Sequence, residues 1–177
     1  VPVPAIIGGD GDIKNTRDNF AAQTDLKWKL NKKITVETGL KSSILQFNSS
    51  TDYFTVAGSS RIKDNFRTNT FNYKENINAA YAQVSKTIVA DMVLKAGLRM
   101  ENTNMKGRQI IPGDTSFNIH RTDYFPYVYL SKNIMKIAGY DLRAYLVYRK
   151  TIARPAYESL NPFPRYIDQY VTETGNP

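Results

Sequence analysis

The side chains that could carry acid–base chemistry are few. His120 is the single histidine of the chain, and it lies between Asp114 and Asp123 in the sequence. A histidine beside a carboxylate can move a proton, but a catalytic triad also needs a nucleophile in a recognisable turn, and no such motif occurs. We therefore expect His120 to be a solvated loop residue.

A second group combines carboxylates with cations. Asp91 and Glu101 share one strand parity with Lys95 and Arg99. Because charges of both signs alternate there, the pattern predicts a wet, charge-balanced wall rather than the carboxylate pair of a glycosidase.

Two short motifs resemble ligand sites without completing them. Residues 8–12, Gly-Gly-Asp-Gly-Asp, lack the spacing and final glutamate of a calcium loop and the lysine of a phosphate-binding loop, so a plain turn is expected. Residues 48–50 fit a glycosylation sequon, to which we give little weight. The chain has no cysteine and a single histidine, so it has no thiolate nucleophile and no metal site built on several such ligands. Because no constellation of residues supports catalysis, we expect no catalytic residue, no cofactor, no metal site and no enzymatic activity.

The composition of the chain excludes some classes of protein and disfavours others. The chain has 177 residues, a net charge of +8, 41% hydrophobic residues and 12% aromatic residues. It has no apolar run long enough for a transmembrane helix. The positive charges are dispersed and mixed with negative ones, which argues against a nucleic-acid partner.

The elements that would position these side chains are β-strands, because apolar and polar residues alternate. The alternation predicts antiparallel strands at about 20–30, 34–41, 75–86, 90–101, 123–132 and 140–149. In the strand at 75–86 the apolar side is assigned to Ile77, Ala79 and Tyr81. In the strand at 123–132 the aromatic side is assigned to residues 125, 127 and 129.

The connections alternate between short turns and long polar loops, the latter at about 48–74 and 103–121. In an up-and-down sheet all long loops then lie at one end, as in outer-membrane barrels. Aromatic residues near strand ends could form interfacial girdles or belong to a core; they are Phe20, Trp28, Tyr81, Phe125, Tyr140 and Tyr148. A soluble sheet with one wet face shows similar alternation and remains an alternative.

Four strings, in order, resemble the β-barrel of TonB-dependent outer-membrane receptors, in the branch called the outer membrane protein β-barrel family. They are residues 71–82 (FNYKENINAAYA), 94–103 (LKAGLRMENT), 123–126 (DYFP) and 148–163 (YRKTIARPAYESLNPF), the last followed by Gly-Asn-Pro at 175–177. The first 70 residues resemble the family only in style.

This resemblance implies an all-β, antiparallel up-and-down meander of about 6–7 long strands, forming an arc of a large barrel in the outer membrane of a Gram-negative cell. We expect residues 1–177 to be a single β-sheet piece of the barrel domain, without plug and closing strands. The implied partners are outer-membrane lipid, a nutrient ligand at the long-loop end, and TonB-type energy coupling through a plug. The implied function is import of an iron chelate, a peptide or an oligosaccharide; a soluble ligand-binding or adhesion module is the alternative.

The most specific string also supplies the candidate site. Prolines stiffen its backbone, an arginine could clamp a carboxylate, and aromatic residues could anchor it. We expect it to order a loop, with direct contact to ligand at the barrel rim as the second possibility. The residues are Arg154, Pro155, Tyr157, Asn161, Pro162 and Phe163.

Overall fold

The computed structural model describes residues 7–89, 91–111, 113–154, 159, 165–166 and 171–175. Most of them lie in β-strands. The strands are β1 (Ile7–Lys29), β2 (Ile34–Ala57), β3 (Ser60–Lys63), β4 (Asn69–Thr87), β5 (Val93–Ile111), β6 (Thr115–Ile137), β7 (Tyr140–Arg149), β8 (Arg165–Tyr166) and β9 (Thr172–Glu173).

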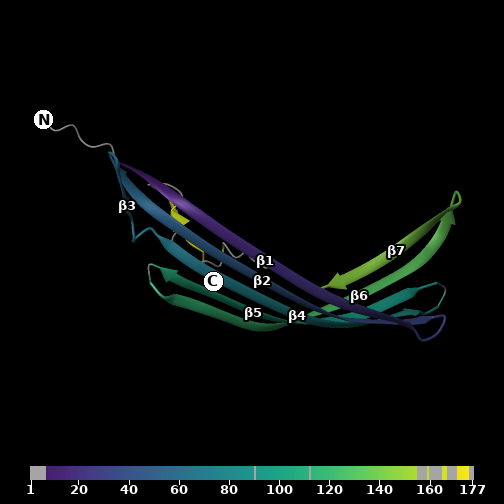
Figure 1. Cartoon of the computed structure of the whole chain (residues 1–177). Coiled ribbons are helices and arrows are strands. Elements are labelled where there is room, and N and C mark those ends of the chain that lie inside the picture. Colours follow the sequence, from purple (N-terminus) through teal and green to yellow (C-terminus); the bar gives the residue numbers. More distant parts are fainter. Residues whose placement is uncertain are drawn as a thin grey trace.

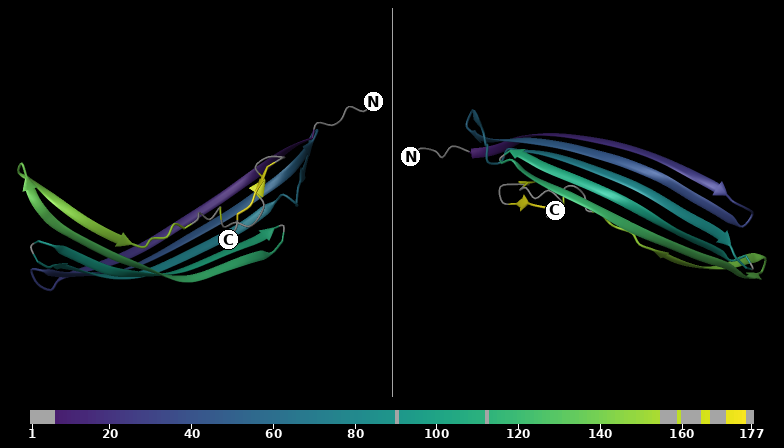
Figure 2. Two further views of the ribbon diagram at one scale, coloured as in Figure 1. Left: turned by 180° about the vertical axis from the view of Figure 1, so that it is seen from behind. Right: turned by 90° about the horizontal axis from the view of Figure 1, so that it is seen from below.

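The principal sheet is an antiparallel meander with the order β1-β2-β4-β5-β6-β7, and β3 pairs with the far end of β2. The sheet is twisted and curled into an arc (Figure 1). Two further views show the same long, bowed strands from behind and from below (Figure 2). The predicted all-β fold class, an up-and-down arc of a barrel, is confirmed.

Tight turns close one end of the sheet. Between β1 and β2, the side-chain oxygen of Asn31 accepts hydrogen bonds from the backbone N–H groups of Lys33 and Ile34. Between β6 and β7, Ala138 and Gly139 both have positive φ, 50° and 85°, as a two-residue hairpin turn of type I′ requires. We call this end of the sheet the turn end.

The other end differs from the prediction. The segments 48–74 and 103–121 were expected to be long loops, but β2 continues to Ala57, and β5 and β6 pair as far as Gln109 and Thr115. Residues 8–12, expected to form a turn, lie within β1. Strand pairing needs only backbone hydrogen bonds, so polar side chains do not end a strand that has a partner on each side. We call this end the extended end.

One proline interrupts no hydrogen bond. Pro126 lies inside β6, immediately beyond the last β6–β7 pair, Tyr127 with Arg149. Its carbonyl oxygen accepts a hydrogen bond from the N–H of Lys150, so its missing donor also faces the side where β7 has ended. A proline is tolerated at such an edge position.

Candidate functional site: two faces of a curled sheet

Exposed apolar side chains gather on one face of the sheet, which we call the outward face. Phe20 and Trp28 on β1 are 65% and 63% exposed, and Leu98 on β5 is 50% exposed. The strand registers place all members of this set on the same parity. We define the apolar band as Phe20, Leu26, Trp28, Leu40, Val84, Leu98, Met100, Tyr124, Val128, Leu142, Leu146 and Tyr148.

The band occupies the half of the sheet nearer the turn end. Toward the extended end the same parity becomes polar, with Asn78 paired to Asn102 and Asn76 paired to Asn104. A soluble protein rarely exposes such a continuous apolar surface. The band suits contact with lipid, and the short turns beside it suit the periplasmic side of an outer-membrane barrel.

The opposite, inward face carries ion pairs beside the band. Lys27 Nζ lies 2.6 Å from Glu37 Oε1, and the Gln83 side chain donates to the same carboxylate. Arg121 pairs with Asp123 at 2.7 Å. This arrangement matches the predicted charge-balanced wall and suits a water-filled lumen.

Arg154 attaches the chain after β7 to this inward face. Its guanidinium forms an ion pair with Glu101 and lies 3.5 Å from Thr103 Oγ1. Glu101 is 6% exposed and Thr103 is fully buried. Arg99 Nε donates to the second oxygen of Glu101 at 2.5 Å, so two guanidinium groups satisfy one buried carboxylate.

Of the predicted loop residues, the structure therefore places Arg154. Its contacts are with Glu101 and Thr103 on β5. The other predicted residues lie outside the described part of the chain; they are Pro155, Tyr157, Asn161, Pro162 and Phe163.

Nearer the extended end, the inward face holds an aromatic cluster that the sequence interpretation missed. Phe47, Phe71, Tyr73 and Met105 are buried together. The Tyr73 hydroxyl donates to Glu75 at 2.9 Å, and burial together with this carboxylate raises the Tyr73 pKa. The alternation Phe71–Tyr73 could have revealed this cluster, but those residues were assigned to a loop.

Further expectations need correction. Tyr81 and Phe125 do not belong to an outward girdle, because the registers place them on the inward face with Arg99. The apolar sides assigned to 75–86 and 123–132 are inward for the same reason. These strands have apolar residues on both parities, so alternation alone did not identify the lipid-facing side.

Two of the residues considered for acid–base chemistry lie in other elements than expected. Asp91 lies in the turn before β5, with a φ of 60°, rather than on the strand beside Glu101. His120 lies on β6 rather than in a loop, exposed, with its ring nitrogen against the side-chain oxygen of Asn104.

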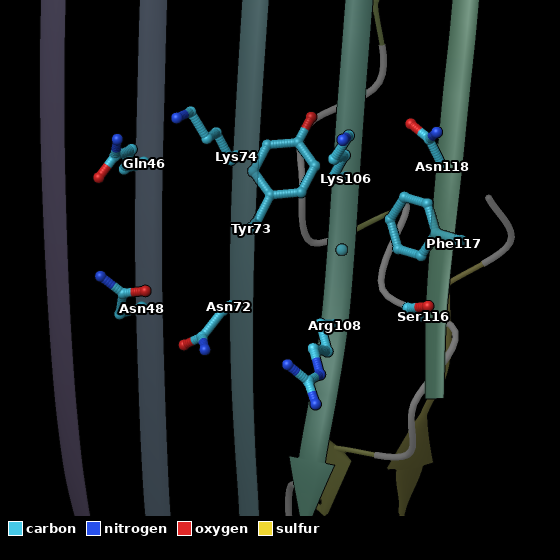
Figure 3. Close-up of a pocket in the computed structure, with 11 residues that line it drawn as sticks. Gln46, Asn48, Asn72, Tyr73, Lys74, Lys106, Arg108, Ser116, Phe117 and Asn118 are labelled. Atoms are coloured by element: carbon cyan, nitrogen blue, oxygen red, sulfur yellow. The ribbon is translucent and has the colours of Figure 1, made fainter. Parts of the chain in front are cut away.

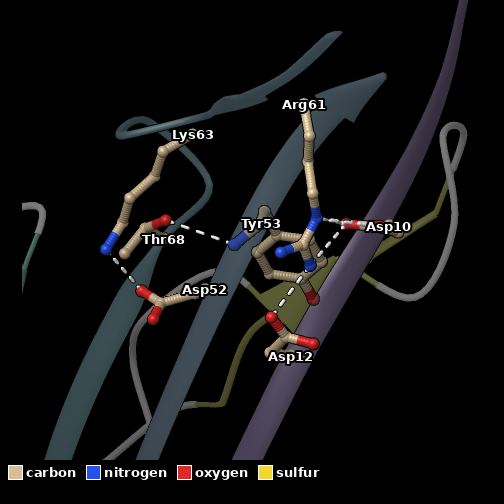
Figure 4. Close-up of polar contacts among 7 residues, drawn as sticks. All are labelled: Asp10, Asp12, Asp52, Tyr53, Arg61, Lys63 and Thr68. Carbon is tan, nitrogen blue, oxygen red and sulfur yellow. Dashed lines mark hydrogen bonds and ion pairs between the residues drawn. The ribbon is translucent and has the colours of Figure 1, made fainter. Parts of the chain in front are cut away.

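At the extended end, β1, β2 and β3 are joined by ion pairs (Figure 4). Arg61 bridges Asp10 and Asp12 at 3.0 and 2.8 Å, and it stacks 3.6 Å from the centre of the Phe54 ring. These carboxylates raise the Arg61 pKa. Lys63 on β3 forms a separate pair with Asp52 on β2 at 2.7 Å.

Within the described residues the structure contains no helix long and apolar enough to cross a membrane. Comparison with curated proteins and with solved structures gave no match. The family model described as "Outer membrane protein beta-barrel family" matches residues 9–177. That match covers almost the entire chain, and the apolar outward face and polar inward face agree with it. The chain belongs to the outer membrane protein β-barrel family, and its place is the outer membrane.

Proposed function

We propose that this chain is part of the barrel of a TonB-dependent receptor that imports a large nutrient, such as an iron chelate, a peptide or an oligosaccharide. The proposal goes beyond the family assignment, which concerns the barrel and its membrane. It includes no covalent chemistry: the chain supplies a wall, a lumen surface and the residues that order the lumen.

The observation that carries the proposal is the inward contact of Arg154. This arginine lies within the most specific of the receptor-like strings, and its side chain reaches Glu101 on β5 instead of the outward face. Burying a carboxylate requires compensating partners, and Glu101 has them in Arg99 and Arg154. This contact holds Arg154 against the lumen side of the wall, which suits a gated importer better than an open diffusion pore.

The inward surface also suits a large, mixed ligand. Ion pairs such as Lys27–Glu37 lie near the turn end, and the aromatic cluster around Tyr73 lies near the extended end. The charged groups suit the polar substituents of such a ligand, whereas the aromatic cluster is buried and stabilises the wall itself. The soluble-module alternative is not retained, because the apolar band packs against no second sheet among the described residues.

The test uses the intact barrel protein that contains this chain, in its own cell. A deletion strain is grown with single iron chelates, peptides or oligosaccharides as the limiting nutrient. We expect growth to fail on one nutrient class and to be restored by the intact gene, with uptake abolished by a proton-motive-force uncoupler. Uptake that survives the uncoupler would contradict energy-coupled import and would indicate passive diffusion.

A further inference from the structure

The outward face carries a basic pocket beyond the apolar band. It lies across β2, β4, β5 and β6 and has a volume of about 610 Å³. Its cations are Lys74 on β4 and Lys106 and Arg108 on β5, flanked by amides and a hydroxyl (Figure 3). The flanking polar residues on the same parity are Gln46, Asn48, Asn72, Ser116 and Asn118.

The two lysines are placed against each other. Lys74 and Lys106 are direct partners in the β4–β5 register. Directly opposed side chains have Cβ atoms about 5 Å apart, and like charges there destabilise the strand pair. Neither lysine forms an ion pair with any described residue. An anion between them would remove the repulsion and accept hydrogen bonds from both.

The third cation is partly neutralised. Arg108 donates to Asp114 from Nε at 2.8 Å and from Nη2 at 2.6 Å. Its remaining N–H groups stay available, because a guanidinium has five donors in all. Three cations and one carboxylate leave the pocket with a net charge of +2. Two other cations of the extended end are neutralised: Arg61 pairs with Asp10 and Asp12, and Lys63 pairs with Asp52.

The height of the pocket above the band identifies the class of anion. Lys106 lies six positions after Met100, or about 20 Å along the strand, which at a tilt of about 40° is about 15 Å along the membrane normal. The interfacial layer of a simple phospholipid is only about 5–8 Å thick on each side. A phosphorylated sugar headgroup extends further, and its acyl chains would lie along the apolar band on the same face.

We propose that Lys74, Lys106 and Arg108 bind the phosphate groups of a phosphorylated glycolipid in the outer leaflet. The site is independent of nutrient import, because it faces away from the lumen. It would hold an ordered lipid against β4 and β5 and fix the depth of the barrel in the membrane.

The test measures lipid binding to the intact barrel protein in detergent by native mass spectrometry. The probes are diphosphorylated lipid A and the same glycolipid after enzymatic removal of its phosphates. We expect Lys74→Gln/Lys106→Gln to weaken binding of the phosphorylated probe by about tenfold, as the loss of charge-assisted hydrogen bonds implies. Lys32→Gln/Lys33→Gln makes the same charge change in the β1–β2 turn and should leave affinity unchanged.

A second variant acts in the opposite direction. Asp114→Asn frees Arg108 and should tighten binding of the phosphorylated probe roughly twofold, as expected for an exposed ion pair. Equal affinity of the double variant and the wild type, or equal binding of the two probes, would overturn the proposal. Displacement of the lipid by millimolar inorganic phosphate alone would also overturn it, because the pocket would then be a site for a free anion.

Discussion

Tyr81 on β4 donates a hydrogen bond of 2.5 Å to Asp25 on β1, across Gly39 of the intervening strand β2. The aromatic ring occupies the space that a side chain at position 39 would fill: a Cβ there would collide with the ring, with the Asp25 carboxylate and with the Thr24 backbone. One glycine thus lets a side chain connect two strands that are not neighbours.

Gly39→Ala should therefore destabilise the barrel by about 1–3 kcal/mol, the cost of overpacking a close contact. Urea unfolding of the intact protein in lipid vesicles measures the change. Gly8→Ala, at a β1 position where a Cβ meets nothing within 4 Å, is the matched control and should unfold like the wild type. Equal midpoints for both variants would show that Tyr81 moves aside at no cost.

The apolar band predicts that the destabilisation caused by a charge on the outward face depends on its depth in the membrane. Leu98→Arg places a charge in the band and should destabilise the inserted barrel by about 2–4 kcal/mol, the cost of a cation near the bilayer midplane. Thr16→Arg, on the outward parity of β1 beyond the band, should cost little. Folding yields in vesicles of both variants test this, and an unaffected Leu98→Arg would mean that this face does not contact lipid.

The attachment of Arg154 is testable by proteolysis. Glu101→Gln removes the buried charge that holds Arg154 in place, and we expect trypsin to cleave after Lys150 more rapidly. Loss of one partner from this nearly buried pair should cost about 3 kcal/mol, toward the lower end for such pairs because Arg154 is partly exposed. Arg121→Gln, which breaks the more exposed pair with Asp123, is the control. Unchanged cleavage would show that other contacts hold the segment.

The tip of the β5–β6 hairpin should respond to acid. Hydrogen bonds from Arg108 hold the pKa of Asp114 below its ordinary value of 3.8. A carboxyl with a lowered folded-state pKa contributes stability that is present above its unfolded pKa and lost as the pH falls through the folded value. Protection factors for hydrogen exchange at residues 109–115, which correct for the intrinsic pH dependence of exchange, should therefore fall below about pH 4.

Asp114→Asn should abolish that acid response, because no carboxyl remains to titrate. Its protection factors at neutral pH should resemble those of the acidified wild type. An acid response that persists in the variant would assign the effect to another group.

The sequence was sufficient to predict the all-β fold class and the antiparallel pairing of the strands. Residues 20–30 and 34–41 alternate clearly and pair as predicted. It was not sufficient for strand length. Polar runs such as Asn48–Ser49–Ser50 resemble loops locally, yet Asn72, Phe71 and Thr70 on β4 supply their backbone partners. Only the pairing of distant segments reveals that these residues are strand.

The lipid-facing side of a strand was predictable where one parity is polar. It was not predictable where both parities carry apolar residues. On β4, Ala80 and Val84 face outward while Ile77 and Tyr81 face inward, and the larger side chains suggested the wrong side. The basic pocket was missed because Lys74 and Lys106 are 32 positions apart in the printed sequence and become neighbours only through the register.

The length of β2 has a consequence for how a solute meets the cell surface. Its 24 residues, at about 3.4 Å each, extend about 80 Å, whereas crossing the hydrocarbon takes only about 9–11 residues of a tilted strand. The remaining residues of β2 extend beyond the bilayer as part of a hydrogen-bonded sheet rather than as a separate loop. A solute approaching from outside would therefore contact the projecting edge of the sheet before it reached the level of the lipids.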